Sequence, residues 1–383
     1  MKKERKYDNK YFGMAFVLLS ICLAVFFSKI VVCEYDMVMH HALAKVMFSK
    51  ELYQTEVPLQ ALAYPLYHLC VKGISMIFQI EVEPAAAVLL SFSVAVSTLI
   101  YRKMMLLLMR ETSVNKVFAD IVSIGAVLFV TARSWLNGWR YYALQCAANP
   151  IHNPTTIFVR PFGMAGLLFF CLYIKNDRPK RESLKWFIGF SFMTFLSTAA
   201  KPSFVFVFLP AMGMMVLLLM VRNKDLMIGI KMMLAVAPTL ILLVVQQLFV
   251  TTNTGMLNIK LQFGSFSNFN FLEVIGVSLA TFPVPVLLFR PQFLKNNFAY
   301  CLSMIALLIG WLQMFFLTNG SSGDFSWGYD IAVQLATVIS LASTRDHDTN
   351  RMIKYAAYVI FAYQVLSGIL YMLLAYKTGG FWF

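Results

Sequence analysis

Apolar segments long enough to cross a lipid bilayer recur along the whole of this 383-residue chain, with no long polar stretch between them. Hydrophobic residues make up 60% of the sequence and charged residues only 13%, a balance far from that of a soluble domain. Because a spanning helix needs roughly 17 to 25 apolar residues, the pattern predicts about eleven helices. They cover residues 11–33, 85–109, 117–133, 160–174, 186–200, 203–221, 227–250, 272–290, 298–317, 327–343 and 353–376. The chain is therefore predicted to be all-α, a polytopic membrane bundle that forms one integral membrane domain over residues 1–383.

Most of the 32 Lys and Arg residues lie in alternate loops between these segments, as they do in the cytoplasmic loops of membrane proteins. This asymmetry predicts a multi-pass protein of the cytoplasmic membrane, with its N-terminus inside and its C-terminus outside. The net charge of +14 then reflects topology and anionic lipid, and it gives no reason to expect a nucleic-acid partner. No small-residue cleavage site follows the first apolar segment, so that segment is predicted to be a retained helix.

The first outer loop, residues 34–84, begins with an acidic pair, Glu34 and Asp36. A carboxylate against the membrane is costly and often marks a functional position. The pair could bind a divalent cation such as Mg or Mn, or one carboxylate could act as general base for an acceptor hydroxyl. The alternative is a pair of charges that only ends the first helix.

The remainder of that loop is predicted to form two juxtamembrane helices. His40 and His41 lie in the first of them, and neighbours on a helix point about 100° apart, so one histidine is expected to face the site and the other the lipid headgroups. The second helix lies in the apolar run 61–78, which would invert the charge asymmetry if it crossed the membrane and is therefore placed in the interface. Tyr64 and His68 are expected at headgroup level, where they are candidates for substrate binding.

Four cationic residues lie on the predicted outer side, where the distribution of Lys and Arg between alternate loops predicts few cations. They are Arg133, Arg140, Arg160 and Lys201. Arginine side chains match phosphate geometry with two parallel hydrogen bonds, so the group predicts a phosphate or pyrophosphate held at the outer leaflet. Alternatively, these cations form ion pairs with Glu34 and Asp36 or with lipid phosphate. His152, set between two prolines in an extended turn, either binds substrate or belongs to a polar rim.

Three short motifs, in their order along the chain, resemble the GT-C superfamily of integral membrane glycosyltransferases. Glu34-Tyr35-Asp36 at the end of the first helix is similar to the modified Asp-x-Asp motif of that superfamily. Tyr64-Pro65-Leu66-Tyr67 looks like the Pro-Leu-Tyr stretch of its first outer loop. Asn153-Pro154 followed by Lys201-Pro202 is similar to a layout found in several of its mannosyl- and glucosyltransferase families. The resemblance covers residues 1–221, and the helices of residues 222–383 correspond to the part that varies between families.

The resemblance implies that Asp36 or Glu34 is the base of an inverting hexosyltransferase. The donor would be a sugar linked to a polyprenyl phosphate, and the acceptor a cell-envelope glycan or glycolipid at the outer face of the membrane. The outer cations would stabilise the departing phosphate, and Asn153 and Lys201 would belong to the substrate site.

Two alternatives stay open. A polysaccharide polymerase that joins repeat units would depend on the outer arginines and not on a carboxylate after the first helix. A lipid or sugar transporter or flippase would carry charges at mid-membrane depth and often inverted repeats. Most charges here lie at helix ends and no repeat is found, which favours the transferase.

Overall fold

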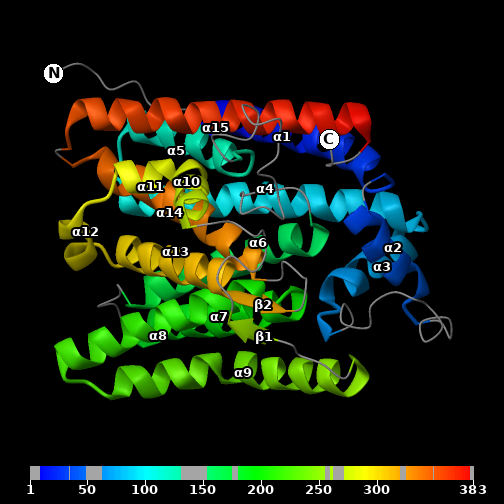
Figure 1. Cartoon of the computed structure of the whole chain (residues 1–383), viewed down its shortest axis with the longest axis horizontal. Helices are drawn as coiled ribbons and strands as arrows, with labels where there is room; N and C mark the ends of the chain where they lie inside the picture. Colours follow the sequence, from blue (N-terminus) through cyan, green and yellow to red (C-terminus); the bar gives the residue numbers. More distant parts are fainter. Residues whose placement is uncertain are drawn as a thin grey trace.

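A computed structural model describes residues 9–33, 35–48, 63–130, 153–174, 180–254, 259–261, 271–319, 325–347 and 349–379. Nearly all of these residues are helical, and the long helices lie side by side along the long axis of the molecule (Figure 1). The helices are α1 Asn9–Ile30, α2 Tyr35–Val46, α3 Leu66–Phe78, α4 Val82–Leu108, α5 Ser113–Ala126, α6 Pro154–Ile174, α7 Lys180–Ala200, α8 Ser203–Asn223, α9 Met227–Thr254, α10 Phe271–Thr281, α11 Pro283–Leu287, α12 Pro291–Asn296, α13 Phe298–Phe316, α14 Ser326–Arg345 and α15 Arg351–Thr378. Two three-residue strands, β1 Ile259–Leu261 and β2 Leu317–Asn319, form an antiparallel pair in which Lys260 lies opposite Thr318.

The predicted all-α, polytopic architecture is confirmed. Within the described part of the chain, seven helices are long and apolar enough to cross a membrane, namely α4, α6, α8, α9, α13, α15 and residues 10–30 of α1. The predicted segments 186–200 and 327–343 lie within α7 and α14, and 117–133 begins within α5, but residues 272–290 form two helices, α10 and α11. Pro283 and Pro285 explain this break, since proline lacks the N–H that a continuous helix needs at those positions.

The first outer loop contains the two short helices that the sequence predicts, α2 and α3. The 13 residues of α3 are too few to span the roughly 30 Å hydrocarbon layer. The depth of His68 in the membrane stays a prediction, but its side chain is fully buried in the protein, as is that of the neighbouring Tyr67, so neither ring faces lipid headgroups. An amphipathic helix can bury its polar side chains when they find hydrogen-bond partners inside, and both residues do so.

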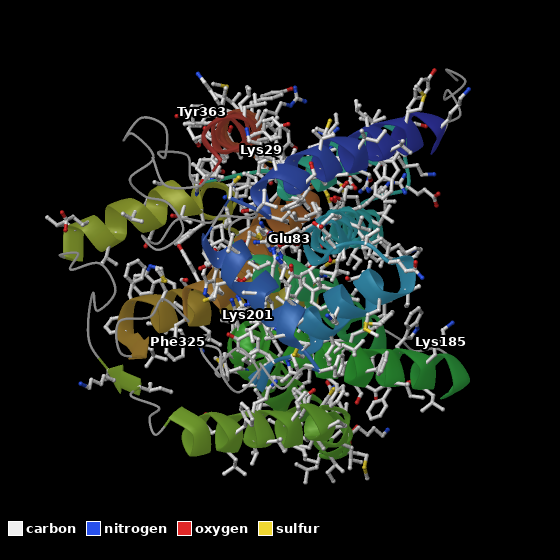
Figure 2. The ribbon with its side chains drawn as sticks, turned by 90° about the vertical axis from the view of Figure 1, so that its right-hand side faces the viewer. Lys29, Glu83, Lys185, Lys201, Phe325 and Tyr363 are labelled. Carbon is white, nitrogen blue, oxygen red and sulfur yellow. The ribbon has the colours of Figure 1, made fainter. Side chains whose placement is uncertain are left out.

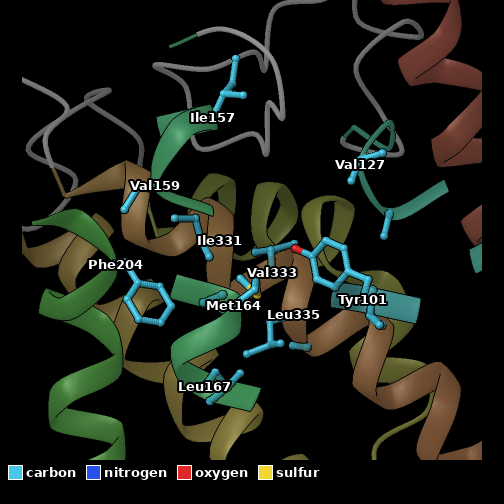
Figure 3. Packing of buried hydrophobic residues seen from close by; sticks show 14 of the residues in the cluster. Tyr101, Val127, Ile157, Val159, Met164, Leu167, Phe204, Ile331, Val333 and Leu335 are labelled. Carbon is cyan, nitrogen blue, oxygen red and sulfur yellow. The ribbon is translucent and has the colours of Figure 1, made fainter. Parts of the chain in front are cut away.

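Helix α14 occupies the centre of the bundle, where every residue from 326 to 344 is buried. It packs against α13, α8 and α4, and its residues Ile331, Val333 and Leu335 contribute to the apolar core (Figure 3). Small residues permit the close approach to its neighbours. A Cβ added at Gly328 would meet the backbone oxygen of Ser203 in α8 at 2.5 Å, and one at Gly310 of α13 would meet Tyr329 at 3.0 Å. The start of α14 is thus held tightly against the start of α8.

Three long helices, α6, α8 and α14, all begin at the end of the bundle that carries α2 and α3 and finish at the end that carries α12 (Figure 1). The residues just before or at their first turns therefore meet in space, although they come from distant parts of the sequence. Candidate site residues gather at this end.

Candidate functional site

Asp36, Asn153 and Lys201 form a continuous chain of hydrogen bonds at the start of α2, α6 and α8. The Nδ2 of Asn153 donates to Oδ2 of Asp36 at 3.0 Å, and the Nζ of Lys201 donates to Oδ1 of Asn153 at the same distance. Asp36 is half-buried, whereas Asn153 and Lys201 are buried. A carboxylate and an ammonium group are thus linked through one amide side chain.

Asn153 owes its position to the start of helix α6. Its Oδ1 accepts hydrogen bonds from the backbone N–H of Thr156 at 3.0 Å and from the hydroxyl of Thr155 at 2.7 Å. This is the arrangement of a helix N-cap, and Pro154 at the first helical position is typical of such a start. The local sequence Asn-Pro-Thr-Thr therefore fixes the amide before any tertiary contact forms.

Lys201 lies in the tight turn between α7 and α8, and only 6% of its surface is exposed. Besides Asn153, its Nζ donates to the hydroxyl of Thr156 at 3.0 Å and lies over the ring of Trp327, 4.6 Å from the centroid. Figure 2 views this end of the bundle and places Lys201 near its centre. Burial of an ammonium group costs free energy unless it is compensated, and these three partners from α6 and α14 hold it in one position.

His40 lies one turn after Asp36 on α2, which places both side chains on the same face of the helix. Its Nδ1 is 3.0 Å from Nε2 of His68, and one ring donates to the other. Burial lowers the pKa of His40 well below its usual value, with further lowering by the charges of His68 and Lys201. Burial also lowers the pKa of His68, to about 4. Both rings are therefore neutral near pH 7. Because the charge of Lys201 helps to lower the pKa of His40, the histidine pair is electrostatically coupled to the hydrogen-bonded chain that contains Lys201.

His41 was expected to face the headgroups if His40 faced the site, and this expectation is wrong. The His41 side chain is 1% exposed, with Nδ1 3.0 Å from the carbonyl oxygen of Val31 and Nε2 3.0 Å from the hydroxyl of Tyr67. Because a carbonyl oxygen only accepts, Nδ1 carries the proton and Nε2 accepts from Tyr67. His41 thus ties α2 to the end of α1 and to α3, and burial lowers its pKa to about 4.

Of the remaining predicted residues, Arg160 is buried on α6, one turn beyond Thr156. It lies close enough to Tyr101 of α4 for an electrostatic interaction. Tyr64 is half-buried in the turn before α3. Glu34, Arg133, Arg140 and His152 lie outside the described residues.

A metal site stays a prediction. Among the described residues, no three His, Cys, Asp or Glu side chains lie close enough together to hold an ion. Asp36 is described but Glu34 is not, so the geometry of the acidic pair as a ligand set is untested.

Sequence reasoning missed two residues at this site. Thr156 is the second residue after the Asn-Pro motif, and Trp327 lies in the first turn of α14, which supplies one wall of the Lys201 environment. Asp330, one turn after Trp327, is 1% exposed in the central helix. A carboxylate within an otherwise apolar segment marks a functional position, and that signal was available in the sequence.

No protein-family model matches the chain, and no curated protein matches it in sequence. Its fold is similar to that of ArnT from Cupriavidus metallidurans, whose crystal structure was determined with undecaprenyl phosphate bound. The two chains are 11% identical, and the match covers 97% of this chain and 76% of ArnT with a TM-score of 0.57. The protein is thus a multi-pass helical membrane protein with an ArnT-like fold.

Proposed function

We propose that this protein is an inverting membrane glycosyltransferase that moves a hexose from a polyprenyl-phosphate donor to a cell-envelope glycan or glycolipid. The observation that carries the proposal is the hydrogen-bonded array of Asp36, Asn153 and Lys201. It holds a carboxylate and a cation a few ångströms apart at one end of an ArnT-like bundle. Those are the two charges that such a transfer needs, one to accept a proton and one to stabilise a departing phosphate.

Asp36 is the proposed general base. As the acceptor hydroxyl oxygen attacks the anomeric carbon, its proton passes to the Asp36 carboxylate. The bond between that carbon and the phosphate oxygen breaks, and the phosphate leaves with the electron pair. A single displacement inverts the configuration at the anomeric carbon.

Asn153 positions the base, because its Nδ2 engages one carboxylate oxygen, Oδ2 of Asp36. Carboxylate oxygens have lone pairs for more than one donor, so an acceptor hydroxyl can bind alongside the amide. Lys201 is the proposed partner of the leaving phosphate. Its buried position strengthens its electrostatic effect relative to a solvated lysine.

Two further observations support the donor and the location. The ArnT structure contains undecaprenyl phosphate, a polyprenyl phosphate of the proposed class. The alternation of Lys- and Arg-rich loops supports a position of the array at the outer face of the cytoplasmic membrane, on the opposite side from most of the cations.

The direct test is sugar transfer by the purified protein in lipid nanodiscs, supplied with hexoses linked to polyprenyl phosphate and with envelope glycolipid acceptors. Loss of a general base lowers the rate by about 10²- to 10⁴-fold, so Asp36→Asn should lower transfer by at least a hundredfold. The matched control is Glu83→Gln, which removes a carboxylate at the same end of the bundle that pairs with Lys45 at 2.5 Å. Glu83→Gln should keep normal transfer.

Other outcomes distinguish the alternative functions. Full transfer by the Asp36→Asn variant, with loss in Arg140→Gln and Arg160→Gln, indicates a repeat-unit polymerase. Movement of lipid-linked sugar across proteoliposomes without any transfer indicates a flippase or transporter. Either result would remove the proposal.

A further inference from the structure

A cavity of about 1010 Å³ lies at the end of the bundle opposite the Asp36–Asn153–Lys201 array. The last turns of α4, α6 and α8 and residues 292–296 of α12 contribute to its lining, together with the start of α13. On α8, the first lining residue, Met215, lies 12 residues after Ser203, which is about 18 Å at 1.5 Å per residue. The cavity is therefore distinct from the proposed transferase site.

The walls of the cavity are apolar. Leucines from three helices line it, including Leu107 of α4, Leu168 of α6 and Leu218 of α8. Leu217 and Val221, which flank Leu218 on α8 but do not line the cavity, are 59% and 79% exposed. Because the outer surface of a membrane bundle faces lipid tails, the cavity wall continues into a surface that contacts the bilayer. A hydrocarbon chain can therefore enter from the side.

Polar and basic groups lie at the same cavity. Arg222 at the end of α8 and Lys295 of α12 both line it and are exposed, and the amides of Gln292 and Asn296 lie beside them. Neither cation forms an ion pair with a described residue. No Asp or Glu occurs among the described lining residues. Within the described part of the chain, the site therefore offers two positive charges without an acidic partner, and several N–H donors, next to an apolar chamber.

We propose that this cavity binds an anionic phospholipid, with an acyl chain against the leucine walls and the headgroup phosphate between Arg222 and Lys295. An acyl chain gains little by moving from the bilayer into an apolar cavity, since both surroundings are hydrocarbon. The charges must therefore supply the selectivity. Basic pockets between membrane helices are suited to anionic headgroups, and each cation near the membrane surface contributes a factor of about five in affinity.

The charge pattern of the chain points to the same occupant. The segments nearest this cavity contain Arg222, Lys224 and Lys231 around the α8–α9 turn and Arg345 and Arg351 around the α14–α15 turn. Alternate loops rich in Lys and Arg mark the membrane face where anionic lipids are abundant. A phospholipid of that leaflet is therefore available to bind in the cavity.

The test is native mass spectrometry of the full-length protein released from nanodiscs made of equal parts phosphatidylglycerol and phosphatidylcholine. The wild-type protein should retain one phosphatidylglycerol in preference to phosphatidylcholine. Arg222→Ala combined with Lys295→Ala should weaken this retention by about 25-fold, the product of two factors of about five. The matched control, Lys231→Ala combined with Arg351→Ala, removes two exposed cations at the same end that do not line the cavity, and it should retain the lipid.

A second variant tests the acyl-chain part of the site. Leu172 lines the cavity from α6, and Leu172→Trp should fill the space of the chain and abolish retention with both cations intact. Equal retention of the two phospholipids overturns the proposal, as does equal loss in the control pair. Retention of a polyprenyl phosphate in place of phospholipid also overturns it, and so does thermal stabilisation by inorganic phosphate alone.

Discussion

The ammonium group of Lys201 donates to the amide oxygen of Asn153 at 3.0 Å, while the nitrogen of the same amide donates to Asp36. This arrangement settles the orientation of the amide, because its oxygen must face the donor and its NH₂ group the acceptor. Asn153 thus separates the carboxylate of Asp36 from the ammonium group of Lys201. In the proposed mechanism, a direct ion pair would weaken Asp36 as a base, and the intervening amide would leave both charges available to substrate.

Replacement of Asn153 by Asp is expected to move the acidic limb of the pH–rate profile to higher pH. The substitution puts a second carboxylate within about 3 Å of Asp36, and each negative charge disfavours ionisation of the other. The shift should be about one pH unit or more. It is measured as the pH dependence of sugar transfer by the variant and by the wild-type protein.

The control for this change is Asn153→Ala, which removes the amide without adding charge. It should lower the rate at every pH and move the acidic limb less than Asn153→Asp does, because it removes one hydrogen bond from the Asp36 carboxylate but adds no charge. Identical pH profiles of wild type and Asn153→Asp would contradict the spacing role of the amide.

Lys201→Met should separate activity from stability. Methionine keeps the length and apolar stem of lysine but removes the charge, so transfer should fall by about 10²- to 10³-fold, as for the loss of one electrostatic stabiliser. The free energy of unfolding should not fall, because the variant no longer buries an ammonium group. Rates and thermal unfolding are compared with Lys260→Met, which alters an exposed lysine on β1. Equal activity of the two variants would exclude a role for Lys201.

The Gly328→Ala substitution should disturb the site by displacing the backbone of α14 from that of α8. Its new Cβ would lie 2.5 Å from the carbonyl oxygen of Ser203 and 2.6 Å from a methyl carbon of Val207. Separation of α14 from α8 should cost about 1–3 kcal/mol of stability and move Trp327 away from Lys201. The control is Gly213→Ala on α8, where no atom lies within 4 Å of the added Cβ. Thermal unfolding and transfer should decrease in Gly328→Ala only.

Acid should destabilise the folded protein through its buried histidines. Burial holds the pKa of His41 and His68 at about 4 in the folded state, against 6.5 for a solvated histidine. Between these values the unfolded chain binds more protons, so this contribution to stability is complete above pH 6.5 and is lost as the pH falls toward 4. For His41 the loss by pH 4 is on the order of 3 kcal/mol.

The measurement is the apparent Tm of the protein between pH 7 and pH 4. His41→Gln should lower the Tm at pH 7 but flatten its decrease with pH. His347→Gln, which changes an exposed histidine at the other end of the bundle, should follow the wild-type curve. A wild-type Tm that does not change over this range would contradict the buried, neutral state of these rings.

Much of the fold could be predicted because membrane spans are encoded locally. The apolar runs predict most of the long helices of the described residues, but they merge residues 272–290 into one helix, which two prolines divide. The two short helices of the first outer loop were also expected. Their burial was not, because whether Tyr67 and His68 face lipid headgroups or other helices depends on which partners the fold supplies.

The sequence alone determined that this chain crosses a membrane many times, and it singled out Asp36, Asn153 and Lys201 as residues of interest. Those are properties of hydropathy and of short motifs, which act over a few neighbouring residues. Only the tertiary structure decided that the three side chains bond to one another, that Trp327 lies against Lys201, and that a basic-lined cavity lies at the opposite end. These relationships depend on which helix ends meet in the packed bundle, and helix packing is set by contacts between residues far apart in the chain.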